Sequence, residues 1–456
     1  MNQTLWAKTA LLPGGWAQNV KVDVAEGRIG AVTAGAVPSG MQLGCLLPAP
    51  VNLHSHAFQR AMAGMTERRG AIAQSGGQDS FWTWRQLMFR FLDQLTPEDV
   101  QAIAAHGQME MLEAGYAAVA EFHYLHHQPG GAPYADLAEL AGRIAAAASA
   151  TGIGLTLLPV LYQQGGCDGR ALTAGQARFG TDIDGFARLW QGAGAHLDAV
   201  DAVLGVAPHS LRAVSRDGLQ VAVALAPGQP LHLHLAEQVA EVVEVQTAYG
   251  ARPVEWLLAN HAVDARWCLI HCTQMETAET VGLAATGAVA GLCPITEANL
   301  GDGIFDGVRW LDAQGRFGIG SDSNVRIALT EELRLLEYTQ RLRDRGRALL
   351  ATQDRSTGRV LFEGAVAGGA QAGGRASGAI RAGDWADMLA LDMSAVDLEG
   401  RQGDGILDAW IFAGDDRMVA DVWSAGRHVV TGGQHVAREG ITAAYRAVMA
   451  RLLGRL

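Results

Sequence analysis

Short apolar runs alternate with longer stretches rich in Ala and Leu between residues 47 and 373. Strands that alternate with helices in this way pair in parallel, because each helix carries the chain back to the same end of the sheet. Eight such units predict an α/β fold, a (β/α)8 barrel of the TIM type, whose chemistry gathers at the carboxyl ends of its strands. A doubly wound sheet is the alternative, but no GxGxxG motif follows the first run. The runs are "CLLPAPVNLHSH", "AAVAEFHY", "IGLTLLPVLY", "AVLGVAPHS", "PLHLHLAE", "WCLIHC", "AVAGLCP" and "FGIGSDS".

The two ends of the chain have a different pattern. Residues 1–46 and 374–438 hold short strand-like pieces separated by Gly turns, and neither end could bury a core alone. We therefore predict one small β-sandwich domain built from both ends, with the barrel at 47–373 between them. Apolar residues at helical spacing predict a C-terminal helix over 439–456. The Gly- and Ala-rich segment 367–378 is predicted to be a linker.

Composition narrows the classes of function. The chain is 49% hydrophobic and 18% charged, as is usual for a water-soluble protein. Its net charge of −12, with no basic stripe, gives no reason to expect a nucleic-acid partner. No apolar run nears the roughly 20 residues of a membrane-spanning helix, and the first residues lack the pattern of a signal peptide. We therefore expect a cytoplasmic protein without a membrane partner. We also expect a homodimer.

A pair of histidines in "VNLHSHAFQR" gives the first chemical signal. Residues two apart on a strand point to the same face, so His54 and His56 can both face the barrel mouth and chelate a divalent metal. The motif is weak alone, but His234, His271 and Asp322 stand at the ends of the fifth, sixth and eighth runs. Three histidines and a carboxylate that leave one position open are typical of a catalytic metal site.

Other ligand sets remain open at this stage. His232 shares a face with His234, and either could be the third histidine ligand. His232 lies deeper in the barrel, where a histidine is more often a hydrogen-bonded core residue. The only lysines, Lys8 and Lys21, lie outside the barrel, which excludes a two-metal centre bridged by a carbamylated lysine. A glutamate bridge, for example through Glu121, is not excluded. We expect one divalent metal per chain, Zn²⁺ by preference.

HxH on the first strand, HxxE on the fifth, His on the sixth and Asp on the eighth resemble the pattern of the amidohydrolase superfamily, in its mononuclear deaminase branch. More narrowly, "NLHSHAFQRAMAG", "DSFWTWRQLMF", "AEFHYLHH", "HLHLAEQ" and "GSDSNVRIALTEELRLLEYTQRLR" resemble the formimidoylglutamate deiminase family. That family hydrolyses N-formimidoyl-L-glutamate to N-formyl-L-glutamate and ammonia during bacterial histidine degradation.

The resemblance assigns roles to residues of this chain. It implies a metal held by His54, His56, His234 and Asp322, a proton shuttle at Glu237, and a proton acceptor at Asp322 paired with His271. The substrate is a small dicarboxylate, and a guanidinium can bind a carboxylate through two hydrogen bonds. Arg212 and Arg85 are the preferred arginines, and Arg60 and Arg326 are alternatives. The expected substrate contacts are Gln59, Arg85, Tyr124, His209, Arg212 and His271.

Two rival functions remain. Another mononuclear deaminase, acting on guanine or an adenosine derivative, would need aromatic stacking and amide contacts rather than arginines. A catalytically inactive binding or assembly module would have no need of Glu237 and His271 beside a metal.

Overall fold

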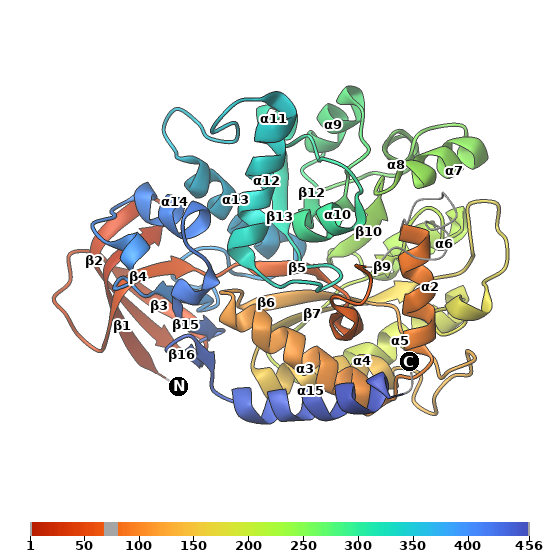
Figure 1. Ribbon diagram of the computed structural model, residues 1–456, viewed down its shortest axis with the longest axis horizontal. Helices are drawn as coiled ribbons and strands as arrows, with labels where there is room; N and C mark the ends of the chain where they lie inside the picture. The colour runs from red at the N-terminus through yellow and green to blue at the C-terminus, as the bar shows by residue number, and fades with distance from the viewer. Residues whose placement is uncertain (1, 68–80, 455–456) are drawn as a thin grey trace.

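The computed structural model describes residues 2–67 and 81–454, with side chains from Leu87 onward in the helix that begins at Phe81. Its central part contains two sheets in which every neighbouring pair of strands is parallel (Figure 1). The first sheet is formed by β5 (Val51–Ser55), β6 (Ala118–His123), β7 (Gly154–Leu161), β8 (Val203–Leu204) and β9 (Ala207–Pro208). The second is formed by β10 (Leu231–Leu235), β11 (Trp267–His271), β12 (Val289–Leu292) and β13 (Arg316–Ile319).

The two sheets follow one another in chain order and meet at both edges. Parallel bridges join Val206 to Leu231 at one junction and Ser55 to Asp322 at the other. All eight predicted runs contain a strand. The fourth is split into β8 and β9 at Gly205, where a Cβ would lie 2.8 Å from the carbonyl oxygen of Pro230.

The first predicted run is two strands rather than one. Pro48 and Pro50 interrupt it, because proline has no N–H to continue a ladder. The part before Pro50 is β4 (Met41–Pro48), which pairs with β1 (Gln3–Leu12) in another sheet, and only the part after it enters the parallel sheet as β5.

Helices follow the strands on the outside of the parallel sheets (Figure 1). They are η1 (Ala57–Met62), α2 (Phe81–Leu92), α3 (Pro97–Glu113), α4 (Glu139–Thr151), η2 (Ala174–Gln176), α5 (Ile183–Ala195), α6 (Arg216–Leu225), α7 (Val239–Tyr249), α8 (Pro253–Asn260), α9 (Thr277–Ala284), α10 (Pro294–Leu300), α11 (Gly307–Asp312), α12 (Leu329–Asp344) and α13 (Thr357–Ala372).

The predicted linker at 367–378 is wrong over its first half, because α13 continues to Ala372. A Cβ on Gly368 would lie 1.8 Å from the carbonyl oxygen of Phe317, and one on Gly369 would lie 2.8 Å from that of Val51. These glycines let the helix backbone pack directly on β13 and β5. Close packing, rather than freedom of the chain, explains the composition of this segment.

Both ends of the chain join in one mixed eight-stranded sheet, in the order β17-β16-β15-β14-β4-β1-β2-β3. Strands from the two ends of the chain therefore lie in one sheet. That this sheet forms a sandwich stays a prediction. The remaining elements are β1 (Gln3–Leu12), β2 (Gly15–Ala25), β3 (Arg28–Thr33), β14 (Met388–Leu391), η3 (Val396–Leu398), α14 (Asp404–Phe412), η4 (Asp416–Met418), β15 (Val419–Ser424), β16 (Arg427–Thr431), β17 (Gln434–His435) and α15 (Arg438–Leu453).

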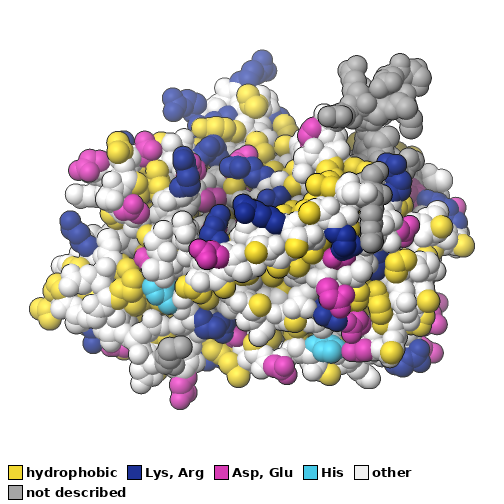
Figure 2. Space-filling view, turned by 60° about the horizontal axis from the view of Figure 1, so that its bottom comes forward, with side chains coloured by type: hydrophobic (Ala, Val, Ile, Leu, Met, Phe, Trp, Pro, Cys, Tyr) yellow, Lys and Arg dark blue, Asp and Glu magenta, His cyan; other side chains and the backbone are white. Residues whose placement is uncertain are grey.

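The terminal helix α15 lies along α3, beside the barrel (Figure 1). On the face seen in Figure 2, basic and acidic side chains are interspersed. Within the described part of the chain, no helix combines the length and apolar character needed to span a membrane.

A buried charge cluster ties the eight-stranded sheet to the barrel. Arg375 donates from Nε to Asp387 at 2.6 Å and from Nη2 to Asp201 at 2.8 Å, and all three side chains are buried. Burial would raise the pKa of Asp201, but hydrogen bonds from Arg427 and the charge of Arg375 hold it below its usual value.

We expect Arg375→Met to lower the free energy of unfolding by about 3–5 kcal/mol, because it leaves the buried carboxylate of Asp387 without its cation, whereas Asp201 keeps Arg427. Urea unfolding at neutral pH measures this loss. The contribution of Asp201 should be present at neutral pH and fade as pH falls below about 3.9, its unfolded pKa. Arg417→Met is the control, since Arg417 is 91% exposed in its pair with Asp415. Equal stabilities of the two variants would contradict the prediction.

Candidate metal centre and active site

The site lies at the carboxyl ends of the parallel strands, where the backbone is unusual. Ala236, His271, Cys272, Asp322 and Asn324 all have positive φ, between 46° and 74°. Non-glycine residues rarely adopt this conformation, and it persists only where the surroundings enforce it. This backbone conformation occurs repeatedly at the ends of β10, β11 and β13, where it directs side chains toward the site.

Four buried side chains converge there: His54, His56, His234 and Asp322. The Nε2 atoms of His54 and His234 are 3.1 Å apart. Asp322 Oδ1 lies 3.3 Å from His54 Nε2 and 3.2 Å from His56 Nε2. Ligands around a tetrahedral ion with bonds of roughly 2.0–2.1 Å are about 3.3–3.4 Å apart. The quartet therefore has the spacing and the donor atoms to hold one divalent metal.

The outer ring nitrogens support this interpretation. His56 Nδ1 lies 3.0 Å from the carbonyl oxygen of Phe122, and His234 Nδ1 lies 3.1 Å from that of His209. A carbonyl can only accept, so each Nδ1 carries a proton and each Nε2 lone pair faces the centre, as in a metal ligand. Burial lowers the pKa of His54 to about 3, which keeps this imidazole neutral.

A buried hydrogen-bond network fixes the turn that carries Asp322. Asn52 on β5 donates to Ser321 Oγ at 2.6 Å, and Ser321 Oγ donates to Asn324 at 2.5 Å. Asn324 in turn donates to Ser55 at 3.1 Å. Asp322 is thus held against β5, the strand of His54 and His56. Burial would raise the pKa of Asp322, but the two neighbouring imidazoles hold it well below its usual range.

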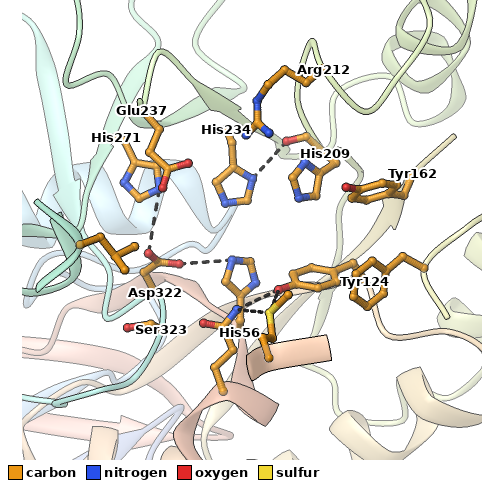
Figure 3. Close-up of a pocket in the computed structure, with 14 residues that line it drawn as sticks. His56, Tyr124, Tyr162, His209, Arg212, His234, Glu237, His271, Asp322 and Ser323 are labelled. Atoms are coloured by element: carbon orange, nitrogen blue, oxygen red, sulfur yellow. Dashed lines mark hydrogen bonds and ion pairs between the residues drawn. The ribbon is translucent and has the colours of Figure 1, made fainter. Parts of the chain in front are cut away.

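His271, Glu237 and Asp322 surround one side of the pocket (Figure 3). His271 Nε2 lies 3.9 Å from Glu237 Oε1 and 4.0 Å from Asp322 Oδ2. Burial alone would lower the pKa of His271, but the charge of Glu237, the hydrogen bond to Glu297 and the charge of Asp322 raise it to about 10. Burial raises the pKa of Glu237. A carboxyl group with a raised pKa can take up a proton and pass it on in general acid–base catalysis.

Arg212 supplies positive charge at the other side of the pocket (Figure 3). Its side chain is buried, and its nearest carboxylate is Glu241, with Arg212 Nε 3.9 Å from Glu241 Oε2. Arg212 Nε makes no hydrogen bond to the described part of the chain. Glu241 also accepts hydrogen bonds from the backbone N–H groups of Ala236 at 3.2 Å and Glu237 at 3.1 Å. One buried carboxylate therefore supports both Arg212 and the segment of Glu237.

The other expected substrate contacts also reach the pocket, with one exception. Gln59 donates to the hydroxyl of Tyr124 at 2.8 Å, and both line the pocket. His209 lines it too, with its ring 4.6 Å from that of Tyr162. Arg85 lies outside the residues whose side chains the structure describes.

The competing arginines are used elsewhere. Arg60 forms a two-pronged ion pair with Glu110, and Arg326 pairs with Glu331. Neither lines the pocket.

The alternative ligands make other contacts. His232 is buried, and its Nε2 lies 2.8 Å from the carbonyl oxygen of Ala372. Glu121 accepts the backbone N–H of Ala57 at 2.7 Å. Neither joins the quartet. The five cysteines are all buried and free, so none forms a disulfide.

Some pocket residues were missed from the sequence. Tyr162 ends the third predicted run, and its position alone could have identified it. Phe179, Met88 and Leu300 lie in helices and loops, where nothing in the sequence distinguishes them. The additional lining residues are Met88, Tyr162, Phe179, Leu300 and Ser323.

Comparison with known proteins gives the class first. Residues 45–429 match the model of the amidohydrolase family. The chain belongs to this family, and the architecture is therefore a TIM-type barrel with a second domain and a site for a divalent metal. Within it, the chain belongs with the formimidoylglutamate deiminases. Residues 2–42 match the model described as formimidoylglutamate deiminase HutF, N-terminal domain.

One curated relative agrees with this placement, and two solved structures share the fold. The chain is 49% identical to the formimidoylglutamate deiminase of Pseudomonas aeruginosa, over 98% of this chain and 99% of that protein. It is 48% identical to an amidohydrolase from Brucella melitensis of known crystal structure, with a TM-score of 0.94 and coverage of 99% and 100%. An adenosine deaminase from Xanthomonas campestris with bound zinc shares the fold at 21% identity, with a TM-score of 0.80 and coverage of 99% and 98%.

Proposed function

We propose that the protein hydrolyses N-formimidoyl-L-glutamate to N-formyl-L-glutamate and ammonia, a step of histidine degradation. The near full-length similarity to the Pseudomonas aeruginosa enzyme carries the proposal. The pocket supports it, because Glu237 and the metal quartet lie at one side and the buried Arg212 lies at the other. The formimidoyl group can therefore meet the quartet and Glu237. The carboxylates of the glutamyl part suit the arginine.

The chemistry needs one water and returns every proton. The C–O bond forms at the formimidoyl carbon, the bond from that carbon to the terminal nitrogen breaks, and this nitrogen leaves as ammonia. A divalent metal held by the quartet would activate the attacking water and polarise the carbon–nitrogen bond. Asp322, paired with His271, accepts one proton of the water, and the second leaves the new C–OH group as the carbonyl forms. Glu237 passes both protons to the departing nitrogen, so each carboxylate ends in the protonation state in which it began.

We further propose that the metal is zinc, because three imidazoles and one carboxylate at tetrahedral spacing suit it. We also propose a cytoplasmic homodimer without a nucleic-acid partner, as expected from the sequence. Residues 1–46 and 374–438 would form one β-sandwich beside the barrel of 47–373, and residues 439–456 the terminal helix. Size-exclusion chromatography with light scattering tests the dimer.

Arg212 should matter more to binding than to the chemical step. The carboxylates lie several bonds from the reacting carbon, so their charge barely changes in the transition state, and an interaction equal in both states affects KM rather than kcat. A hydrogen bond to a charged group contributes about 1.5–3 kcal/mol, so Arg212→Ala should raise KM roughly 10- to 150-fold. Steady-state kinetics measure the change. Arg216→Ala, four residues on at an exposed position, is the control, and unchanged kinetics of Arg212→Ala would place the carboxylate site elsewhere.

A substrate panel separates the proposal from its rival. Proteins named 5-methylthioadenosine/S-adenosylhomocysteine deaminase are similar to this chain at about a quarter identity, for example 26% over 77% of the chain. We expect ammonia from N-formimidoyl-L-glutamate and none from adenosine, S-adenosylhomocysteine or guanine. Turnover of a purine with no turnover of the formimidoyl compound would reverse the assignment. The buried arginine favours the dicarboxylate, since its Nε, which has no hydrogen-bond partner in the described part of the chain, can donate to a substrate carboxylate and a purine offers none.

A further inference from the structure

A buried carboxylate stands behind His271, on the side away from the substrate pocket. Glu297 lies in the first turn of α10, the helix that follows β12, and its side chain is 6% exposed. Glu297 Oε1 lies 3.3 Å from His271 Nδ1 and accepts the backbone N–H of Cys293 at 2.9 Å. The backbone of its own helix therefore holds this oxygen in place against the imidazole.

The contact fixes a proton on Nδ1 of His271. A carboxylate oxygen can only accept, so the ring must present Nδ1–H to Glu297. The opposite tautomer would set a ring lone pair against the oxygen lone pairs of Glu297. With Nδ1 engaged, His271 Nε2 faces Glu237 Oε1 at 3.9 Å and Asp322 Oδ2 at 4.0 Å.

The backbone alone does not fix the ring. His271 has a φ of +74°, which sets the direction of its Cβ but leaves rotation about the side-chain bonds open. Glu297 is the only partner of Nδ1 among the described residues. Removing it would free the ring to turn.

We propose that Glu297 is a positioning residue for the deimination: it holds the Nδ1–H of His271 and thereby aims Nε2 at the reacting atoms. The inference rests on the proposed function. Glu297 thus supports the active site from behind His271. Of its helix α10, only Leu300 lines the pocket. Residues that hydrogen-bond to the outer nitrogen of a ligand or catalytic histidine typically contribute roughly 10- to 100-fold to activity or metal affinity.

Glu279 offers a matched control. It is 6% exposed, lies in the first turn of the neighbouring helix α9, and accepts the backbone N–H of Glu276 at 2.8 Å, as Glu297 does for Cys293. Its other partners are Arg252 Nε at 2.9 Å and the backbone N–H of Glu255 at 3.3 Å, and neither residue lines the pocket. A purely structural role would therefore show equally at both positions.

The experiment replaces each glutamate with Met, which keeps the length and removes the acceptor, and with Gln, which keeps an acceptor and removes the charge. We expect Glu297→Met in the metal-loaded enzyme to lower kcat roughly 10- to 100-fold with KM changed less than about threefold. Glu297→Gln should lose less, because its amide oxygen can still accept from Nδ1–H. Glu279→Met should keep kcat within about threefold, and metal content should stay at the wild-type value in every variant.

A double-mutant cycle tests whether the effect runs through His271. In a His271→Gln background, Glu297→Met should cause no further loss, because residues that act as one unit are not additive. The full loss in that background, or an equal loss in Glu279→Met, would overturn the proposal. If Glu297→Met does not fold, the same cycle with Glu297→Gln decides.

A second readout does not depend on turnover. In protein labelled with ¹⁵N-histidine, the hydrogen-bonded Nδ1–H signal that disappears in His271→Gln should also be lost or displaced in Glu297→Met and unchanged in Glu279→Met. An unchanged signal in Glu297→Met would refute the positioning role. Absence of turnover in the wild type, with the predicted signal changes intact, would refute the proposed function alone.

Discussion

His234→Ala should lose the bound metal and nearly all activity, whereas His232→Ala should keep both. The two histidines lie two residues apart on β10 and share a face, yet only His234 joins the metal quartet. The metal supplies several kcal/mol of transition-state stabilisation, and each 1.36 kcal/mol is tenfold in rate, so the loss should reach about 10³-fold or more. His232→Ala removes only a buried hydrogen bond to Ala372 and should lower stability rather than metal content.

Elemental analysis of the purified variants measures the metal directly. We expect about one metal ion per chain in the wild type and in His232→Ala, since a catalytic site of this kind holds one ion. His54→Ala and Asp322→Ala should behave like His234→Ala, because their donor atoms belong to the same quartet. Two tightly held ions at full activity would contradict a mononuclear centre. Loss of metal from His232→Ala alone would show that the wrong histidine had been chosen.

Glu237→Gln should keep its metal and lose kcat by at least about 10²-fold, the lower range for general acid–base catalysis. Its carboxyl group stands outside the quartet, 3.9 Å from His271 Nε2, and burial raises its pKa, as a proton shuttle requires. The amide keeps the shape and hydrogen-bonding oxygen of the side chain but cannot carry a proton. Steady-state kinetics and metal analysis on the same sample separate the two effects.

The control for Glu237→Gln is Glu244→Gln, which lies on α7 and pairs with Arg170 away from the pocket. We expect this variant to retain wild-type kinetics. If Glu237→Gln loses its metal, Glu237 is a ligand, and one of the quartet must take the role of shuttle. If it keeps full activity, another group delivers the proton, and the buried carboxyl of Asp302, whose pKa burial and the charge of Glu237 raise to about 9, is the next to test.

The strands and the metal quartet could be predicted from the sequence because both follow local rules. A period of two puts His54 and His56 on one face, and the barrel topology brings the ends of distant strands together. His234, Asp322 and His271 each end a short apolar run, so position along the chain was enough to find them. The tie between His232 and His234 could not be broken in this way, since depth in the barrel depends on strand register.

The sequence misleads where packing, rather than local pattern, decides the structure. The glycines near 367–378 look like a linker, but two of them allow α13 to touch β13 and β5. Glu241 and Glu297 look like ordinary charges in the first turn of a helix. Their contacts with Arg212 and His271 bring together side chains from different units of the barrel, and no local pattern reveals such contacts.

The most direct test of the central claim follows the nitrogen. N-Formimidoyl-L-glutamate labelled with ¹⁵N at the terminal nitrogen is incubated with the metal-loaded enzyme, and the products are identified by NMR. The proposed reaction predicts ¹⁵N-ammonia and N-formyl-L-glutamate in equal amounts, because the bond to the terminal nitrogen breaks. Labelled formamide with free L-glutamate would mean that the other carbon–nitrogen bond is cut, and no turnover would remove the assignment altogether.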